Sequence, residues 1–165
     1  MQTWTNVAWK TIQQLEVGEL ALAKINGARS LILKCTDTCV GILDIPTTYK
    51  GVWFPPSAPI NCISLGTDWF LDVVIDEDFF PENPIVYDSN AMLFFGPAGF
   101  RWKFRSHANA HNEIYVPISG GDTAQFLEQH SAPVLQWSIW ESEKHRLADG
   151  NRPLMQFSPT GTGQS

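Results

Sequence analysis

The sequence predicts an all-β domain that carries one or two short helices. Short runs rich in apolar and aromatic residues recur at close intervals and are separated by Gly, Pro, Asn and Asp. In the clearest case, Asn26-Gly27 separates two runs of alternating polarity, which is typical of a two-residue β-hairpin. The 165 residues are 44% apolar and 12% aromatic, so the chain can bury one core and is not disordered.

The expected elements follow from turn residues and from the period of the apolar positions. The prolines of residues 46–60 favour a loop there, because proline has no amide donor for a central strand. The apolar spacing in Thr5–Glu16 and Thr123–His130 allows short helices. The expected strands are Glu19–Ile25, Arg29–Cys35, Cys39–Ile45, Ile60–Leu65, Trp69–Ile75, Pro84–Tyr87, Met92–Phe95, Phe100–Arg105, Glu113–Ile118, Val134–Glu141 and Pro153–Phe157.

Charge and composition argue against two classes of partner. The formal net charge is −6, and no Lys/Arg run is present, so we expect no nucleic-acid binding. The N-terminal residues carry neither a basic segment nor an apolar one, and no apolar run approaches the ~20 residues of a membrane span. The sequence therefore predicts a cytoplasmic protein that does not bind membranes.

Three cysteines are present, Cys35, Cys39 and Cys62. An odd number does not favour a disulfide framework. The Cys35-x3-Cys39 spacing differs from the usual zinc spacing, and no second ligand pair lies nearby. The two residues are interpreted either as small core residues near a turn or as a metal or redox pair.

The most informative segment is the histidine segment, residues 107–113. Its side chains His107, Asn109, His111 and Glu113 fall at period two, and would project to one side of an extended backbone. Two imidazoles and a carboxylate on one face are suitable ligands for zinc or for a non-heme Fe(II) centre. The alternative interpretation is that His107 and His111 are loop residues that are hydrogen-bonded only locally.

This segment resembles the metal-binding motif of the cupin family, which is His-x-His, three or four residues, Glu, six residues and Gly. Here His107-x-Asn109 is followed after three residues by Glu113 and after six more by Gly120. Asn109 stands where the family has its second histidine, so either Asn109 or His111, two residues before Glu113, would occupy the second ligand position. The later segment around His145 resembles the family's second motif, which implies that His145 lies on a later strand of the barrel. The resemblance implies a double-stranded β-helix or jelly-roll barrel, here residues 1–157, followed by a flexible tail, residues 158–165.

The resemblance also implies a function. His107, His111, Glu113 and His145 would hold a divalent metal (Fe, Mn, Ni or Zn) for a lyase, isomerase or dioxygenase reaction on a small polar organic molecule. The other expected site residues are Tyr115, for proton transfer or substrate orientation, and Arg101 or Arg105, as a bidentate clamp on a substrate carboxylate. Trp102 and Trp140 would line the barrel mouth and pack on the ligand.

A second hypothesis keeps the barrel but removes the metal and the catalysis. The chain would then be a binding module that holds a small ligand, or an inhibitor or immunity protein that binds a protein partner. Low charge and many aromatics also predict a homodimer, because an apolar face needs cover. Elemental analysis of the metal content per chain distinguishes the two hypotheses.

Overall fold

The structure, a computed structural model, describes residues 7–44, 51–74, 92–109 and 111–158. Within these ranges the protein is all-β, as predicted, and strand residues exceed helical ones far more than twofold. The elements are β1 (Ala8–Thr11), the 3-10 turn η1 (Ile12–Gln14), β2 (Leu20–Ile25), β3 (Ala28–Lys34), β4 (Val40–Asp44), β5 (Val52–Phe54), β6 (Asn61–Gly66), β7 (Phe70–Val73), β8 (Leu93–Gly96), β9 (Gly99–Ser106), β10 (Glu113–Pro117), β11 (Ala132–Val134), β12 (Trp137–Trp140), α1 (Glu143–Leu147) and β13 (Met155–Phe157).

The β2–β3 hairpin confirms the clearest expectation from the sequence. Ile25 lies opposite Ala28, so the two residues between them form the whole turn. Asn26 has φ 48° and Gly27 has φ 83°. A turn with both central φ angles positive matches the twist of the two strands, and Asn-Gly adopts it readily.

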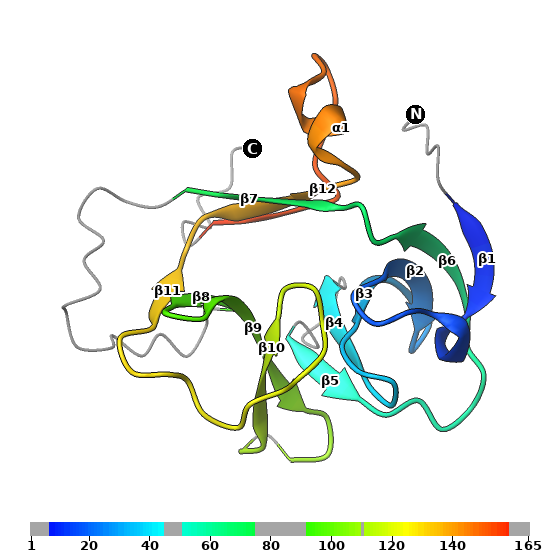
Figure 1. Ribbon diagram of the computed structural model, residues 1–165. Coiled ribbons are helices and arrows are strands. Elements are labelled where there is room, and N and C mark those ends of the chain that lie inside the picture. Colours follow the sequence, from blue (N-terminus) through cyan, green and yellow to red (C-terminus); the bar gives the residue numbers. More distant parts are fainter. Residues whose placement is uncertain (1–6, 45–50, 75–91, 110, 159–165) are drawn as a thin grey trace.

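Two sheets contain all the strands of the described ranges (Figure 1). The ten-stranded sheet has the order β1-β6-β2-β3-β4-β5-β9-β8-β11, with β10 also paired to β9, and the three-stranded sheet has the order β13-β12-β7. A short parallel pairing of β5 with β9 joins the N-terminal strands to the C-terminal ones. The described strands thus form open sheets and not the closed barrel that was expected.

The hairpin strands contribute to two separate hydrophobic cores. Leu20 and Leu33 belong to the larger core, which also contains Trp137 of the three-stranded sheet. Ala21 and Ile32 belong to a smaller core on the opposite face. Because successive strand residues point to opposite faces, the apolar run of β2 and β3 supplies both cores. The larger core holds the two sheets together.

Both expected helices are wrong within the described residues. In the first, Thr5–Glu16, the chain forms strand β1 and a single 3-10 turn, η1. In the second, Thr123–His130, Ala124 forms a β-bridge with Tyr115. Strand pairing outweighs a weak helical spacing, since tertiary context overrides local propensity.

Other differences are local. Strand β5 lies inside the expected loop 46–60, and helix α1 was not expected. Neither helical element of the described chain is long and apolar enough to cross a membrane. The expected strand Pro84–Tyr87 and all of the tail except Ser158 lie outside the described residues.

Candidate functional site

The histidine segment is a turn and not an extended strand. Strand β9 ends at Ser106 and β10 begins at Glu113. The side-chain Oδ1 of Asn109 accepts a hydrogen bond from the His111 N–H at 3.0 Å. The backbone carbonyl of Asn109 accepts one from the Asn112 N–H at 2.9 Å. This Asn-centred turn disrupts the expected period of two. His107 and His111 are therefore exposed turn residues and do not share a strand face with Glu113.

Glu113 instead belongs to a charged cluster on one face of β9 and β10. The Tyr115 hydroxyl donates to Glu113 Oε2 at 3.1 Å. Glu113 Oε1 lies 3.4 Å from Arg105 Nε and 3.9 Å from Lys103 Nζ. The register explains the contact, since Arg105 lies directly opposite Glu113 and Lys103 directly opposite Tyr115. We call Lys103, Arg105, Glu113 and Tyr115 the Glu113 cluster.

The Glu113 cluster has the character of a packing unit. The Lys103 side chain is only 3% exposed, and its ammonium lies 5.7 Å from the centre of the Phe94 ring. Phe94 and Tyr115 form a small hydrophobic core of their own, with Ala124 and Leu127 packed against it. A buried ammonium needs an opposite charge nearby, and Glu113 supplies it.

His145 lies on helix α1 and not on the expected strand. Its N–H donates to Ser142 Oγ at 3.1 Å, which caps the helix. Its Nε2 lies 3.9 Å from Glu141 Oε2, and its ring centre lies 6.2 Å from that of Trp140. The structure thus brings together two predicted site residues, His145 and Trp140, but in a group distinct from the Glu113 cluster.

The remaining predicted residues lie apart. Arg101 Nη2 is 4.0 Å from Glu128 Oε1. Trp102 is fully buried in the larger core, where its ring centre lies 5.0 Å from that of Trp137 in an edge-to-face arrangement. In the described part of the chain, no three His, Cys, Asp or Glu side chains gather as a metal site would require. The residues expected to hold a divalent metal are thus not gathered into such a group among the described residues.

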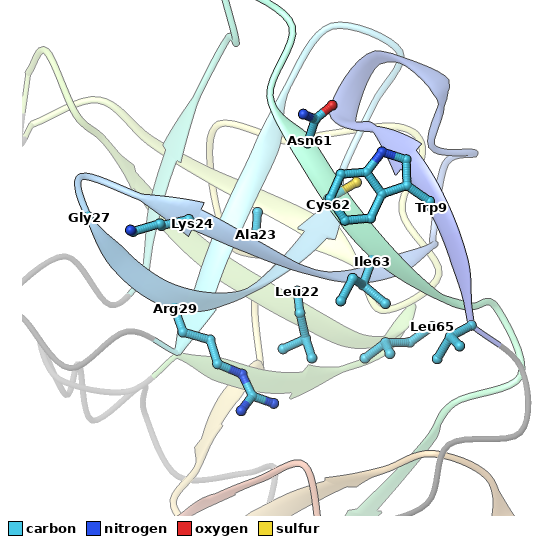
Figure 2. Close-up of a pocket in the computed structure, with 11 residues that line it drawn as sticks. Trp9, Leu22, Ala23, Lys24, Gly27, Arg29, Asn61, Cys62, Ile63 and Leu65 are labelled. Atoms are coloured by element: carbon cyan, nitrogen blue, oxygen red, sulfur yellow. The ribbon is translucent and has the colours of Figure 1, made fainter.

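An apolar groove of about 700 Å³ lies at the β1 end of the large sheet (Figure 2). Its floor follows the strand register, because Trp9 lies opposite Ile63 and Ile63 opposite Leu22. Trp9 is 73% exposed and Ile63 is 40% exposed. We call it the Trp9 groove; it is lined by Val7, Trp9, Leu22, Ala23, Lys24, Gly27, Arg29, Asn61, Cys62, Ile63 and Leu65.

Two basic residues lie at the hairpin end of the Trp9 groove. Lys24 is directly opposite Arg29, one position beyond the pair that closes the turn. Both are exposed, and neither forms an ion pair with any described residue. Figure 2 shows Arg29 extending beside Leu22, with Lys24 nearer the turn. An apolar floor ending in two cations suits a molecule with an apolar body and an anionic group.

Sequence reasoning missed the Trp9 groove, although one signal was present. Once Asn26-Gly27 is assigned as a two-residue turn, the register places Lys24 opposite Arg29. The exposure of Trp9 could not be deduced, because it depends on where the second sheet stops covering the first.

Comparison with known proteins adds no relative. No protein-family model, no curated protein and no solved structure matches the chain. The cupin resemblance therefore rests on the two sequence motifs alone, residues 107–120 and the segment around His145, and stays a prediction.

Proposed function

We propose that the chain is a binding module for a small molecule that combines an apolar body with an anionic group, and that the Trp9 groove is its site. The observation that carries this proposal is the pair Lys24 and Arg29 at one end of an exposed apolar groove. Ligand sites typically have volumes of about 300–1,000 Å³, mostly apolar walls and a few convergent polar groups. The groove has a volume in this range and mostly apolar walls, and its two basic residues lie at one end.

The apolar wall supplies the larger part of the binding free energy. Covering a large side chain that was exposed to water contributes about 1.5–3 kcal/mol. Trp9 offers most of its indole for such contact, and Val7 and Ile63 extend the same surface. An alkyl chain or a ring system laid along this row would remove all three side chains from water.

The basic pair supplies selectivity for charge. Like charges directly opposite each other in a hairpin are destabilising, so Lys24 and Arg29 impose a cost on the folded protein. A carboxylate, sulfonate or phosphate bound between them offsets that cost. Arg29 can hold such a group with two parallel hydrogen bonds.

Matched ten-carbon probes test the proposal by calorimetric titration below their micellar concentrations. Decanoate should bind more tightly than decan-1-ol, and decyltrimethylammonium should bind most weakly. Arg29→Ala should weaken decanoate binding about tenfold, the loss expected for one charged hydrogen bond, and leave decan-1-ol unchanged. Trp9→Ala should weaken both ligands about tenfold or more.

The control variant is Lys144→Gln, which removes an exposed cation of α1 outside the groove. Equal binding of decanoate and decyltrimethylammonium, or equal losses in Arg29→Ala and Lys144→Gln, would contradict the proposal. So would sedimentation of a dimer that Trp9→Ala converts to a monomer, because a second copy would then occupy the groove.

Four features stay predictions: the metal-dependent cupin enzyme, its jelly-roll barrel, the homodimer and the cytoplasmic location. If the enzyme hypothesis is right, elemental analysis of protein purified without chelators should find one metal ion per chain. The Glu113 cluster does not favour it, since the Glu113 carboxylate already interacts with Lys103, Arg105 and Tyr115.

A further inference from the structure

Cys35 and Cys39 lie opposite each other where the chain turns between β3 and β4. The last ladder pair of these strands is Lys34 with Val40, and one step further the Cys35 N–H donates to the Cys39 carbonyl at 3.1 Å. Directly opposite residues of an antiparallel pair have Cα atoms about 4.5–5.5 Å apart. A disulfide needs about 4.4–6.8 Å, so the backbone already has the geometry of a bridge.

The two side chains point to the same side of this turn. Both cysteines belong to the larger core, where the Cys35 thiol donates to the Leu33 carbonyl at 3.5 Å and the Cys39 sulfur accepts from the Thr36 hydroxyl. Both are free thiols. Closing a bridge between them requires the loss of two hydrogens between residues that the backbone already pairs.

The Thr36 hydroxyl forms a hydrogen bond with one of the two sulfurs, that of Cys39. The same hydroxyl oxygen accepts hydrogen bonds from the N–H groups of Thr38 at 3.3 Å and Cys39 at 3.2 Å. The hydroxyl itself donates to Cys39 Sγ at 3.2 Å. The sulfur of Cys39 thus has a donor placed to stabilise its thiolate form.

The two thiols differ in acidity because their surroundings differ. The hydrogen bond from Cys35, with those from Thr36 and the charge of Lys34, lowers the pKa of Cys39 to about 6 despite its burial. The same contact with Cys39, together with burial, raises the pKa of Cys35 well above its usual value. Cys39 is therefore the more acidic of the two thiols, and Cys35 is the one that keeps its proton.

We propose that Cys35 and Cys39 form a reversible redox site, in which a hydroperoxide oxidises Cys39 and Cys35 then closes a disulfide. The Cys39 thiolate attacks one peroxide oxygen, the O–O bond breaks, and a sulfenic acid and an alkoxide or hydroxide form. The Cys35 sulfur attacks the Cys39 sulfur, the S–O bond breaks, and the hydroxyl leaves as water with the Cys35 proton. Two thiols and one hydroperoxide thus give one disulfide, one alcohol (or water) and one water, and a dithiol such as dithiothreitol reverses the change.

Two observations support this assignment: Cys39 lies beside exposed residues, and the third cysteine, Cys62, lacks the features that activate Cys39. Asp37 and Thr38 at the tip of the turn are exposed, and Cys39 retains 6% exposure beside them, so a small peroxide has a short path. Cys62 lies in the smaller core, and burial raises its pKa. Thiolate content and exposure determine peroxide sensitivity, so Cys62 serves as an internal control.

The test treats the reduced full chain with one equivalent of hydrogen peroxide, followed by alkylation and tryptic digestion. Cys35 and Cys39 occur together in the peptide of residues 35–50, and Cys62 occurs in the next one. The peptide of residues 35–50 should lose two hydrogens and become resistant to alkylation until dithiothreitol is added, whereas Cys62 stays alkylatable. Retention of both free thiols in that peptide, or faster oxidation of Cys62, would overturn the proposal.

Variants separate the roles of the two cysteines. Cys35→Ser keeps a hydrogen-bond donor at position 35 but removes the sulfur that would close the disulfide. Oxidised Cys39 should then stay a sulfenic acid, which dimedone labels. Cys39→Ser should slow oxidation of Cys35 at least tenfold. The rate in the unmodified chain should reach half its plateau near pH 6, and Thr36→Val should move that midpoint upward. A midpoint near the ordinary thiol value of about 8.5, unchanged in Thr36→Val, would show that the turn does not activate Cys39.

Discussion

The Glu113 cluster and the hairpin end of the Trp9 groove each hold two basic side chains on one sheet face. In the Glu113 cluster, the acid lies across the strands from Arg105 and within 3.9 Å of Lys103. At the hairpin, Lys24 faces Arg29, and no described acidic residue pairs with either. In the first arrangement the chain itself supplies an acidic partner; in the second, no described residue does.

The difference indicates which charges stabilise the fold and which are available to a ligand. Lys103 is buried and depends on Glu113, so these charges form a structural unit. Lys24 and Arg29 are exposed and repel each other, so their placement has a cost that no described contact offsets. Proteins tend to retain such local conflicts at functional sites.

The largest expected effect is on stability at the Glu113 cluster. Glu113→Gln removes the negative charge that Glu113 places 3.9 Å from the buried Lys103 ammonium, which should lower the free energy of unfolding by about 3 kcal/mol. Tyr115 can still donate to the glutamine oxygen, so the loss reports on charge. Chemical denaturation at pH 7 measures it.

The matched control for this prediction is Glu128→Gln, at the exposed partner of Arg101. That change should cost less than about 1 kcal/mol, because exposed ion pairs contribute little. If the two variants lose the same stability, Lys103 does not depend on Glu113, and the contrast with the hairpin disappears.

The next effect concerns Glu19, a paired carboxylate near the groove strands. Burial opposes its ionisation, but hydrogen bonds from Ser64, the Glu16 N–H and Lys10 outweigh it and hold the pKa of Glu19 below its ordinary value of 4.5. The resulting stability is present above pH 4.5 and is lost as the pH falls through the folded value. Glu19→Gln should cost about 1–2 kcal/mol at pH 7 and remove part of the acid dependence.

Urea denaturation at pH 7 and at successively lower pH values measures this dependence. Glu16→Gln, an exposed change three residues earlier, is the control and should keep the acid dependence of the unmodified chain. An identical pH dependence for Glu19→Gln and the unmodified chain would show that the paired carboxylate does not control acid stability.

Features that depend on neighbouring residues could be predicted from the sequence, whereas features that depend on contacts between distant strands could not. Asn26-Gly27 determines its hairpin through its own backbone preferences, and the expectation holds. Arg101, Lys103 and Arg105 share a strand face as their spacing suggests, since they lie opposite Pro117, Tyr115 and Glu113. Their acidic partner was not predictable from spacing alone, because the β9–β10 register determines it.

The histidine segment was misread for a physical reason. Alternation implies a shared face only where the backbone is extended, and the hydrogen bonds of Asn109 close a turn there. His145 was placed on a strand although Ser142 precedes it by three residues, the spacing of a helix N-cap contact. The Trp9 groove depends on how far one sheet covers the other, which no local pattern encodes.

The smallest effect on stability should come from Arg29→Glu at the hairpin. This variant should raise the free energy of unfolding while it weakens binding of an anionic ligand. The variant places a carboxylate directly opposite Lys24, so a repulsive pair becomes an attractive one. Opposite charges across strands contribute about 0.2–1 kcal/mol, so the variant should unfold at a slightly higher denaturant concentration than the unmodified chain. It should also lose its preference for decanoate over decan-1-ol. Lys24→Gln, which removes the repulsion without adding an acid, should be intermediate in both measurements. Lower stability in Arg29→Glu would mean that the basic pair already has an anionic partner in the folded chain, and the groove would then not be available for an anionic ligand.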